Sequence, residues 1–318
     1  MDSLEFIAEK LNKRKNLAVF VHVRPDGDTI GSAIGFKLGM ESLGKKVDVY
    51  SSDAVPEKFN FIKQVKEISS QFVDNNYDAY VALDCSEDYR IGDLITKFLN
   101  GNETYCIDHH VSNTYFAKYN FVEDRASNSE NVYALLKLMN VNVTKEMATP
   151  LLMGMVTDTG NFSQKNTDSQ VLKAASELVS IGADVNQINY LMFKKQSKQR
   201  AKLFALCMNK MRFFYEDKIA IISVLKEDLE LSGATPDVTE GFIDFALNID
   251  TTEVAICLLE TKNRQFKISF RSKGVDVNEI AGVFGGGGHI LASGCMLNGY
   301  YEDVIDKLVY ASKQRIPT

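Results

Sequence analysis

The chain contains only four histidines, and each lies beside a carboxylate, another histidine or a run of glycines. The first, His22, is followed by Asp26 and Asp28 in the segment HVRPDGD. Pro25 and Gly27 favour an irregular turn there, which lets imidazole and carboxylate groups converge. A loop that only joins a strand to a helix, with Asp28 near the helix N-cap, is the simpler reading of the carboxylates. A metal site built from His22, Asp26 and Asp28 explains the histidine as well.

Two further apolar segments end in the same kinds of residue. The segment AYVALD ends at Asp84, and TYCIDHH ends at Asp108, His109 and His110. A carboxylate at the end of a buried strand can also simply cap the next helix. If the strand ends meet, however, the carboxylates repel one another strongly, and divalent cations are their natural neutralisers. Asp158, in GMVTDTGNF, supplies one more carboxylate and is a weak signal by itself.

These residues lie in a half of the chain where strand and helix patterns alternate. We expect strands at 17–22, 47–51, 79–84 and 104–108, and helices at 29–43, 145–158 and 168–181. Within the first helix, Gly31, Gly35 and Gly39 form one small face. Continuous apolar strands separated by helices predict an α/β domain, a parallel sheet with helices on both faces. Right-handed crossovers place successive strand ends at one edge of this sheet, where ligands usually bind.

The pattern changes after the basic, polar stretch KKQSKQRAK. Expected strands at 219–225, 253–260 and 265–271, with helices at 237–247, 276–283 and 301–314, predict a smaller α+β domain with a mixed or antiparallel sheet. We therefore predict a catalytic domain over 1–190, a linker over 191–200 and a C-terminal domain over 201–318. The basic stretch is more typical of a solvated helix face than of a binding site, and we assign it no role.

Composition narrows the classes of function. The 318 residues are 45% hydrophobic and carry a net charge of −6, which argues against a protein that grips long duplex nucleic acid. A small anionic substrate is still compatible, because a local metal cluster outweighs the global charge. The five cysteines are scattered and odd in number, as expected for reduced thiols in the cytoplasm. No apolar run is long enough for a membrane span, and the first residues lack a signal-peptide pattern.

The segments HVRPDGD, VALD, IDHH and VTDTGNF resemble, in order and rough spacing, the four motifs of the DHH phosphoesterase superfamily. This superfamily includes RecJ-like exonucleases, manganese pyrophosphatases, cyclic-dinucleotide phosphodiesterases and nanoRNases. The segment KISFRSK and the run from Gly285 to His289 resemble the DHH-associated C-terminal domain, DHHA1. The arrangement and length are most similar to the bifunctional oligoribonuclease (nanoRNase)/pAp phosphatase family.

The resemblance implies two Mn²⁺ ions held by imidazole and carboxylate groups. The implied metal ligands are His22 and Asp26 for one ion, Asp28, His109 and Asp158 for the other, and Asp84 as a bridge between them. Asp108 would orient a neighbouring ligand, and His110 would face the scissile phosphate; with Asp84 they form the predicted catalytic set. Mixed imidazole and carboxylate ligands suit manganese. Zinc is an alternative, although no cysteine is placed to bind it.

In the C-terminal domain, the resemblance and the residue types indicate substrate binding. Arg271 can offer two parallel hydrogen bonds to a phosphate, although a solvated arginine at a strand end is the simpler reading. The glycine run beside His289 can form a backbone nest for phosphate, although such a run can also be only a flexible loop. The predicted substrate-binding residues are His110, Arg271, Gly286, Gly287, Gly288, His289 and Ser293.

The expected function is manganese-dependent hydrolysis of short oligoribonucleotides, about two to five nucleotides long, and of 3′-phosphoadenosine 5′-phosphate (pAp) to mononucleotides. The expected partners are such nucleotides, without long duplex nucleic acid or a membrane, and a homodimer is one assembly open to the chain. A pyrophosphatase, a cyclic-dinucleotide or linear-dinucleotide (pApA) phosphodiesterase, and a catalytically inactive nucleotide-binding regulator are the alternatives. The GGGGH run argues against the first of these, and the intact set of metal-binding residues argues against the last.

Overall fold

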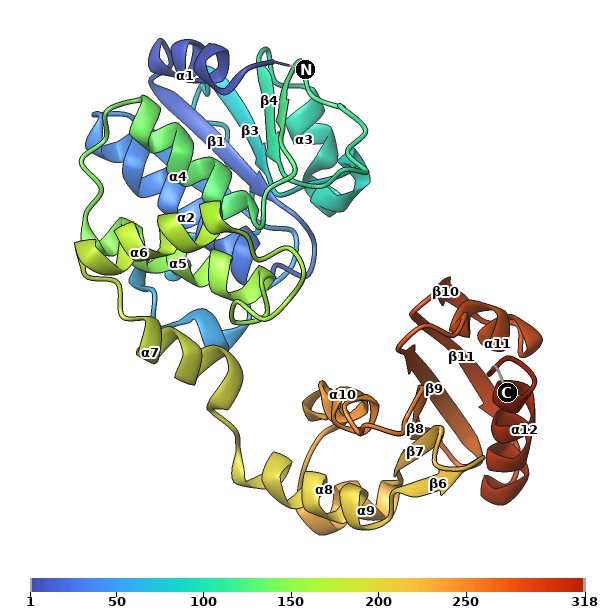
Figure 1. Cartoon of the computed structure of the whole chain (residues 1–318). Coiled ribbons are helices and arrows are strands. Elements are labelled where there is room, and N and C mark those ends of the chain that lie inside the picture. Colours follow the sequence, from blue (N-terminus) through green and yellow to red (C-terminus); the bar gives the residue numbers. More distant parts are fainter. Residues whose placement is uncertain (1, 317–318) are drawn as a thin grey trace. The chain divides into compact units, whose positions relative to one another are not determined.

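The computed structural model describes residues 2–316, which form two compact units. The N-terminal unit extends to Lys195 and the C-terminal unit begins at Gln196, within the segment where the sequence predicts a linker. Helix α7 (Val185–Asn189) and a π-helical turn (Tyr190–Lys194) end the first unit, and α8 (Lys198–Asn209) begins the second. Figure 1 labels the elements of each unit.

A five-stranded parallel sheet forms the centre of the N-terminal unit (Figure 1), in the order β2-β1-β3-β4-β5. Its strands are β1 (Asn16–Val21), β2 (Lys46–Tyr50), β3 (Ala79–Leu83), β4 (Thr104–Asp108) and β5 (Tyr119–Val122). The first four were expected from their apolar runs, whereas β5 is short and contains a polar residue. Because the strands are parallel, the loops after β1, β3 and β4 leave the sheet at the same edge.

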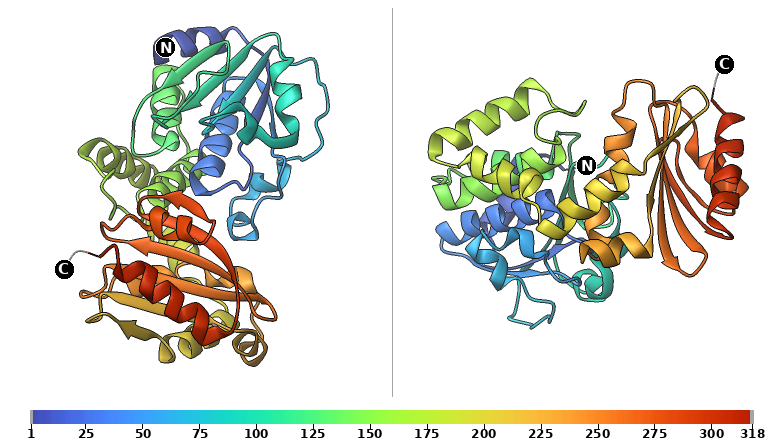
Figure 2. Two further views of the ribbon diagram at one scale, coloured as in Figure 1. Left: turned by 90° about the vertical axis from the view of Figure 1, so that its right-hand side faces the viewer. Right: turned by 90° about the horizontal axis from the view of Figure 1, so that it is seen from below.

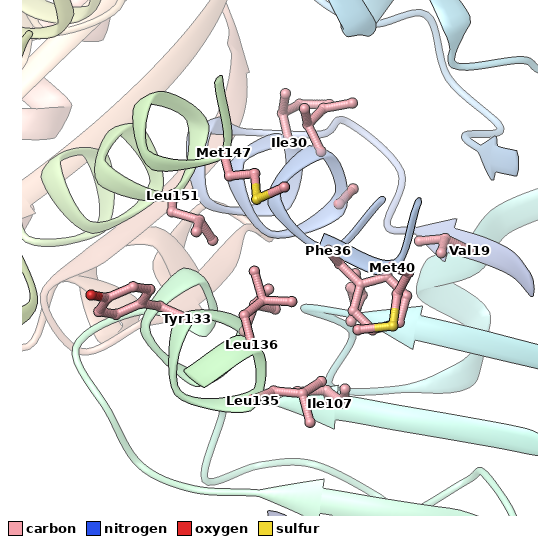
Figure 3. Packing of buried hydrophobic residues seen from close by; sticks show 14 of the residues in the cluster. Val19, Ile30, Phe36, Met40, Ile107, Tyr133, Leu135, Leu136, Met147 and Leu151 are labelled. Carbon is pink, nitrogen blue, oxygen red and sulfur yellow. The ribbon is translucent and has the colours of Figure 1, made fainter. Parts of the chain in front are cut away.

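Helices cover both faces of this sheet, as predicted. On one face, Leu17, Val19 and Val21 belong to the main core, together with residues of α1 (Leu4–Asn12), α2 (Gly27–Ser42), α4 (Asn128–Leu138), α5 (Lys145–Asp158) and α6 (Ser169–Ile181). Figure 3 shows side chains of β1, β4, α2, α4 and α5 in this core. On the opposite face, Ala18 and Phe20 pack with residues of η3 (Asp88–Leu94) and α3 (Ile95–Leu99). Alternate residues of β1 therefore serve two separate cores.

The small face predicted on α2 brings that helix close to two others. A Cβ atom on Gly31 would overlap the carbonyl oxygen of Pro150 in α5, and one on Gly39 would overlap the side chain of Leu136 in α4. At Gly31 the neighbour is backbone, so glycine is required there, whereas at Gly39 the Leu136 side chain would have to shift. The contacts fix α2, and with it the first turn that carries Asp28, against α4 and α5.

Helix α4 is absent from the predicted set, although its start carries a readable signal. Ser127 is its N-cap and accepts a hydrogen bond from the N–H group of Glu130, and this S-x-x-E spacing is that of a capping box. The helix expected at 237–247 is shorter in the structure. A 3₁₀ turn covers Pro236–Thr239, and α10 starts only at Phe242 because Gly241 has a φ of 81°, outside the helical range.

The C-terminal unit is built on a six-stranded mixed sheet in the order β10-β11-β9-β8-β7-β6. Its strands are β6 (Arg212–Phe214), β7 (Ile219–Val224), β8 (Val254–Lys262), β9 (Gln265–Ser272), β10 (Gly287–His289) and β11 (Ala292–Asn298). The β7–β8 pair is parallel and the other pairs are antiparallel. Helices α11 (Val277–Val283) and α12 (Tyr301–Lys313) pack on one face, and α8, α9 (Lys226–Ser232) and α10 (Phe242–Leu247) lie on the other (Figure 2). This is the predicted mixed α+β domain, with three additional strands.

Within residues 2–316, none of the helices combines the length and the apolar character that a membrane span requires. The five cysteines are free thiols, and four of them are buried.

Candidate metal centre

His22 is the first residue of the loop after β1, one of the three loops that leave the parallel sheet at the same edge. It follows β1 directly and is 3% exposed. Its Nδ1 lies 2.8 Å from the carbonyl oxygen of Val23, while its Nε2 lies 3.8 Å from Oδ2 of Asp26 and 3.5 Å from Oδ2 of Asp84. Asp26 is also the N-cap of α2 and accepts hydrogen bonds from the first N–H groups of that helix. The structure therefore contains both a helix cap and an imidazole–carboxylate group, but the N-cap is Asp26, and Asp28, which the sequence placed near the cap, lies in the first turn.

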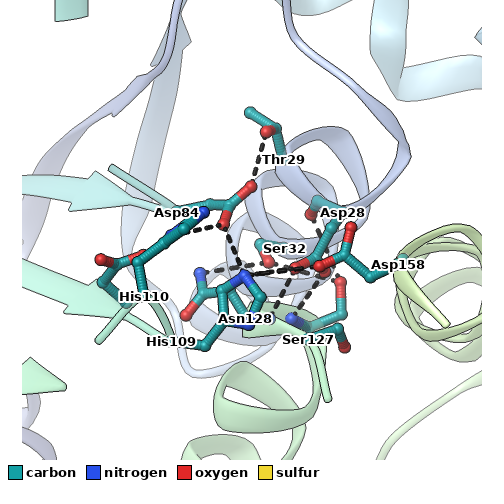
Figure 4. A network of polar contacts seen from close by, with 12 residues as sticks. Asp28, Thr29, Ser32, Asp84, His109, His110, Ser127, Asn128 and Asp158 are labelled. Atoms are coloured by element: carbon teal, nitrogen blue, oxygen red, sulfur yellow. Dashed lines mark hydrogen bonds and ion pairs between the residues drawn. The ribbon is translucent and has the colours of Figure 1, made fainter. Parts of the chain in front are cut away.

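Asp84 belongs to one group of ligand atoms with His22 and Asp26 and to another with His109. Figure 4 shows Asp84 next to Thr29 and His109. Asp84 follows β3, is buried and has a φ of 60°, a conformation that persists where the surroundings fix it. Its Oδ2 faces His22, whereas its Oδ1 lies 3.4 Å from Nε2 of His109. This Oδ1 atom is buried and has no hydrogen-bond partner within the described residues. Because buried oxygens need partners, the carboxylate fits a ligand shared by two cations.

The second group comes from α2, from the end of β4 and from the end of α5. Nε2 of His109 lies 3.9 Å from Oδ2 of Asp28 and 3.4 Å from Oδ2 of Asp158. Each of the two groups has its ligand atoms within 4.8 Å of one another. The structure therefore brings together all six predicted metal ligands, namely His22, Asp26, Asp28, Asp84, His109 and Asp158.

The segment between β5 and α4 and the first turn of α4 hold the second group in place. The carbonyl oxygen of Arg125 lies 3.1 Å from Nδ1 of His109. The N–H groups of Asn128 and Ser129 donate to the two oxygens of Asp28 at 2.5 and 2.8 Å. A carboxylate at a helix N-terminus is stabilised by those N–H groups and by the helix dipole. These contacts were not predicted, although the S-x-x-E spacing at the start of α4 could have located the helix start.

Asp108 supports His110, as expected of a residue that orients its neighbour. Oδ1 of the buried Asp108 lies 2.8 Å from Nδ1 of His110, and its Oδ2 accepts a hydrogen bond from Nδ2 of Asn113 at 2.7 Å. The hydrogen bond with Asp108 raises the pKa of His110, although burial acts to lower that pKa. Nδ1 of His110 lies 3.8 Å from Oδ1 of Asp84, so the ring stands next to the shared carboxylate and its Nε2 is left for another partner.

Thr29 is a member of the centre that the sequence did not indicate. Its buried hydroxyl group contacts Nε2 of His22 and lies 3.0 Å from Oδ1 of Asp26 and 2.7 Å from Oδ2 of Asp84. A hydroxyl group has one proton, so it donates to one of these carboxylates at a time. A threonine in the first turn of a buried helix gives no separate sequence signal.

Several carboxylates lie close together in the metal centre and repel one another. Burial and the charge of Asp84 raise the pKa of Asp28 to about 7, and burial with the charges of Asp28 and Asp84 raises that of Asp158 to about 9. Burial acts to lower the pKa of His109, but the carboxylates of Asp84, Asp28 and Asp158 around it raise the pKa to about 11. Burial acts to raise the pKa of Asp84, yet the neighbouring imidazoles of His109 and His22 lower it. Divalent cations would relieve this repulsion, so the residues fit such ions.

The substrate-binding residues predicted in the C-terminal unit lie on two faces of its sheet. Arg271 of β9 pairs with Ala292 of β11, which pairs with His289 of β10. Directly paired residues project from the same face, so Arg271 and His289 flank the small Ala292. The next residue, Ser293, points to the other face, where its buried hydroxyl group donates to the carbonyl oxygen of Val277 at 2.5 Å. The Ser293 side chain, which was predicted to contact the substrate, therefore forms a hydrogen bond within the domain instead.

The glycine run also differs from the predicted phosphate-binding nest, because Gly287–His289 forms strand β10. The N–H group of Gly286 donates to the carbonyl oxygen of Ala281 at 2.9 Å, and that of Gly288 donates to Oδ1 of Asn278 at 2.8 Å. A Cβ atom on Gly286 or Gly288 would overlap the backbone of β11 or lie against it. These two glycines thus serve strand packing, and their N–H groups are already occupied.

Comparisons with known proteins agree with this architecture. Residues 16–155 match the DHH family, N-terminal domain, and residues 218–317 match the DHHA1 domain. The chain is 31% identical over 315 residues to the bifunctional oligoribonuclease and PAP phosphatase NrnA of Thermus thermophilus. The aligned region covers 96% of this chain and 93% of that protein. The chain belongs to the DHH family.

As a DHH protein, the chain is a phosphoesterase, a hydrolase that depends on divalent metal ions. Its structure is similar to that of an exopolyphosphatase-related protein from Bacteroides fragilis, with a TM-score of 0.85 and 26% identity over 98% of this chain and 95% of that one. Exonuclease RecJ bound to manganese has the same fold, with a TM-score of 0.55 and 15% identity over 100% and 96% of the two chains. The predicted pairing of a DHH domain with a smaller α+β domain is confirmed.

Proposed function

We propose that this DHH protein hydrolyses short oligoribonucleotides and pAp to mononucleotides, with two Mn²⁺ ions as cofactors. The observation that carries the proposal is the position of Asp84. One of its oxygens faces the group led by His22, and the other faces the group led by His109. A carboxylate shared in this way supports two ions rather than one, and mixed imidazole and carboxylate ligands suit manganese.

The residues around these ions would have different roles in the reaction. Bound divalent cations would supply activation of water and charge stabilisation on the phosphoryl oxygens. His110, whose Nδ1 is held by Asp108, would present its Nε2 to a phosphoryl oxygen of the substrate. Asp108 is then a positioning residue, and Asp84 and His110 are the catalytic residues.

Two features support a short substrate. The Thermus thermophilus relative is named an oligoribonuclease and PAP phosphatase, and this chain carries a net charge of −6, which does not favour an extended basic track for a long strand. Arg271 and His289, which share a face of the C-terminal sheet, would contact the substrate. Gly287, exposed beside His289, would let the substrate approach the backbone closely.

A turnover panel in Mn²⁺ tests the proposal. It contains pAp, RNA of two to five nucleotides, pyrophosphate and cyclic dinucleotides, with a 24-nucleotide RNA as the length control. We expect hydrolysis of pAp and of the short RNAs, and a preference for these over the long RNA. Turnover of pyrophosphate or of cyclic dinucleotides alone would replace this substrate assignment, and nucleotide binding without any turnover would show a regulator instead.

A further inference from the structure

A cavity of about 420 Å³ lies beside one half of the metal centre. It is lined by His22, Val23, Arg24, Asp26, Tyr89 and Arg90. His22 and Asp26 belong to the centre, so the cavity adjoins the place where a cation would sit. The other residues have no role in the function proposed above, and two of them are arginines.

The fold fixes both arginines at this cavity. The N–H group of Val23 donates to the carbonyl oxygen of Arg90 at 2.7 Å, which ties the loop after β1 to η3. Arg24 has a φ of 54°, and its N–H group donates to Oδ2 of Asp53 at 2.7 Å. A Cβ atom on Gly92 would lie 2.6 Å from the side chain of Val23, so the two loops pack without a side chain between them. Arg24 is not a glycine, and a positive φ at such a residue persists only where the surroundings hold it.

Neither guanidinium group has a hydrogen-bond or ion-pair partner within residues 2–316. Arg24 is exposed, and Arg90 is half-buried with its Nε atom buried and unpaired. Arg14, Arg125, Arg212 and Arg315 each pair with a carboxylate, although Nε of Arg14, Arg125 and Arg315 is likewise buried and without a hydrogen bond. In contrast to these four, Arg24 and Arg90 carry charges without a carboxylate partner and line the same cavity, so the pair is suited to an anion that is supplied from outside the chain.

We propose that Arg24 and Arg90 form a subsite for a second phosphate group of the substrate, one nucleoside away from the phosphate at the metal centre. The guanidinium fork matches phosphate oxygens and keeps its charge at every physiological pH. The subsite selects nucleotides with two phosphates, such as pAp and 5′-phosphorylated dinucleotides. This inference rests on the proposed function for its substrate, although the phosphate chemistry of the cavity does not depend on turnover.

The kinetic test compares one dinucleotide with and without its 5′ phosphate, pApA and ApA, in Mn²⁺. We expect wild-type kcat/KM to favour pApA by at least about tenfold, the effect of one charge-assisted hydrogen bond. Arg24→Gln and Arg90→Gln each lower this ratio toward one, mainly through KM, and Arg24→Lys keeps part of it. Lys66→Gln, which removes one positive charge from an exposed position of the same unit, keeps the wild-type ratio. A purely structural role for the arginines would slow both substrates equally and leave the ratio unchanged, which overturns the subsite.

A binding test separates the subsite from the activity. Calorimetry in Ca²⁺ measures the affinity of pAp and of adenosine 3′-monophosphate, which lacks the 5′ phosphate, for the wild type and for the two glutamine variants. A preference for pAp that depends on Arg24 and Arg90 supports the subsite, even if the wild type hydrolyses no nucleotide and the proposed function fails. Equal affinity for both ligands in the wild type, or a preference that survives both substitutions and disappears in Arg271→Ala, overturns it.

Discussion

The hydroxyl group of Thr29 lies 2.7 Å from Oδ2 of Asp84, the carboxylate shared by the two ligand groups. The same hydroxyl group contacts Nε2 of His22, so one small side chain in the first turn of α2 touches ligands from two different loops. A neighbour of this kind orients a metal ligand and tunes its affinity. The first turn of α2 therefore contributes to the centre through Thr29 as well as through Asp28.

We expect Thr29→Val to weaken Mn²⁺ binding by about 10–100-fold, because the substitution keeps the shape of the side chain and removes its hydrogen bond. Thr29→Ser retains the hydroxyl group and should remain close to the wild type. The measurement is the Mn²⁺ concentration that gives half-maximal activity. A valine variant with wild-type metal dependence would show that the hydroxyl group has no part in ligand positioning.

Substitution of Asp108 by Asn should lower kcat by about 100-fold, the effect of a misplaced catalytic group. The carboxylate of Asp108 holds Nδ1 of His110, and a neutral amide holds it less firmly. Metal content should stay normal, because neither oxygen of Asp108 belongs to the ligand groups. Loss of bound metal together with activity would instead assign Asp108 to the metal centre.

We expect Asp84→Ala to abolish turnover and to lose bound Mn²⁺, as measured by elemental analysis. Asp93→Ala, which removes an exposed carboxylate, is the matched control. Near-normal kcat with bound metal in the Asp84 variant would show that this residue is not the shared ligand.

In the C-terminal unit, Arg271→Ala should raise KM for pAp and for dinucleotides. The loss of a charge-assisted pair corresponds to about 1.5–3 kcal/mol, while metal occupancy should not change. Lys307→Ala removes an exposed positive charge from α12, across the sheet from Arg271, and serves as the control. Unchanged KM and kcat in the Arg271 variant would remove this residue from substrate binding.

The metal centre could be predicted from the sequence because its ligands follow apolar strands. Parallel strands end at one edge, so His22, Asp84 and His109 had to meet there once the alternating pattern was recognised. Asp158 ends a helix, and its place was indicated only by the family motif. Thr29 could not be found in this way, because a buried threonine in a helix has no distinctive pattern.

The C-terminal unit was harder to predict, because tertiary pairing decides its local structure. Segment 287–298 is rich in glycine and small residues and is typical of a loop. In the structure it supplies β10 and β11, which are held by pairing with each other and with β9. The phosphate nest was therefore wrong for Gly286 and Gly288, and Ser293 faces the core because side chains alternate along a strand.

The rate at which the protein hydrolyses a ribodinucleotide, before and after removal of its metal ions, tests the central claim most directly. Elemental analysis confirms that the stripped sample holds no divalent metal, and Mn²⁺ is then added back in steps. We predict no turnover in the stripped sample and full recovery with Mn²⁺, which should exceed the recovery with Mg²⁺ or Zn²⁺. Full activity in a sample shown to be free of metal would contradict the assignment of these histidines and aspartates as a catalytic metal centre.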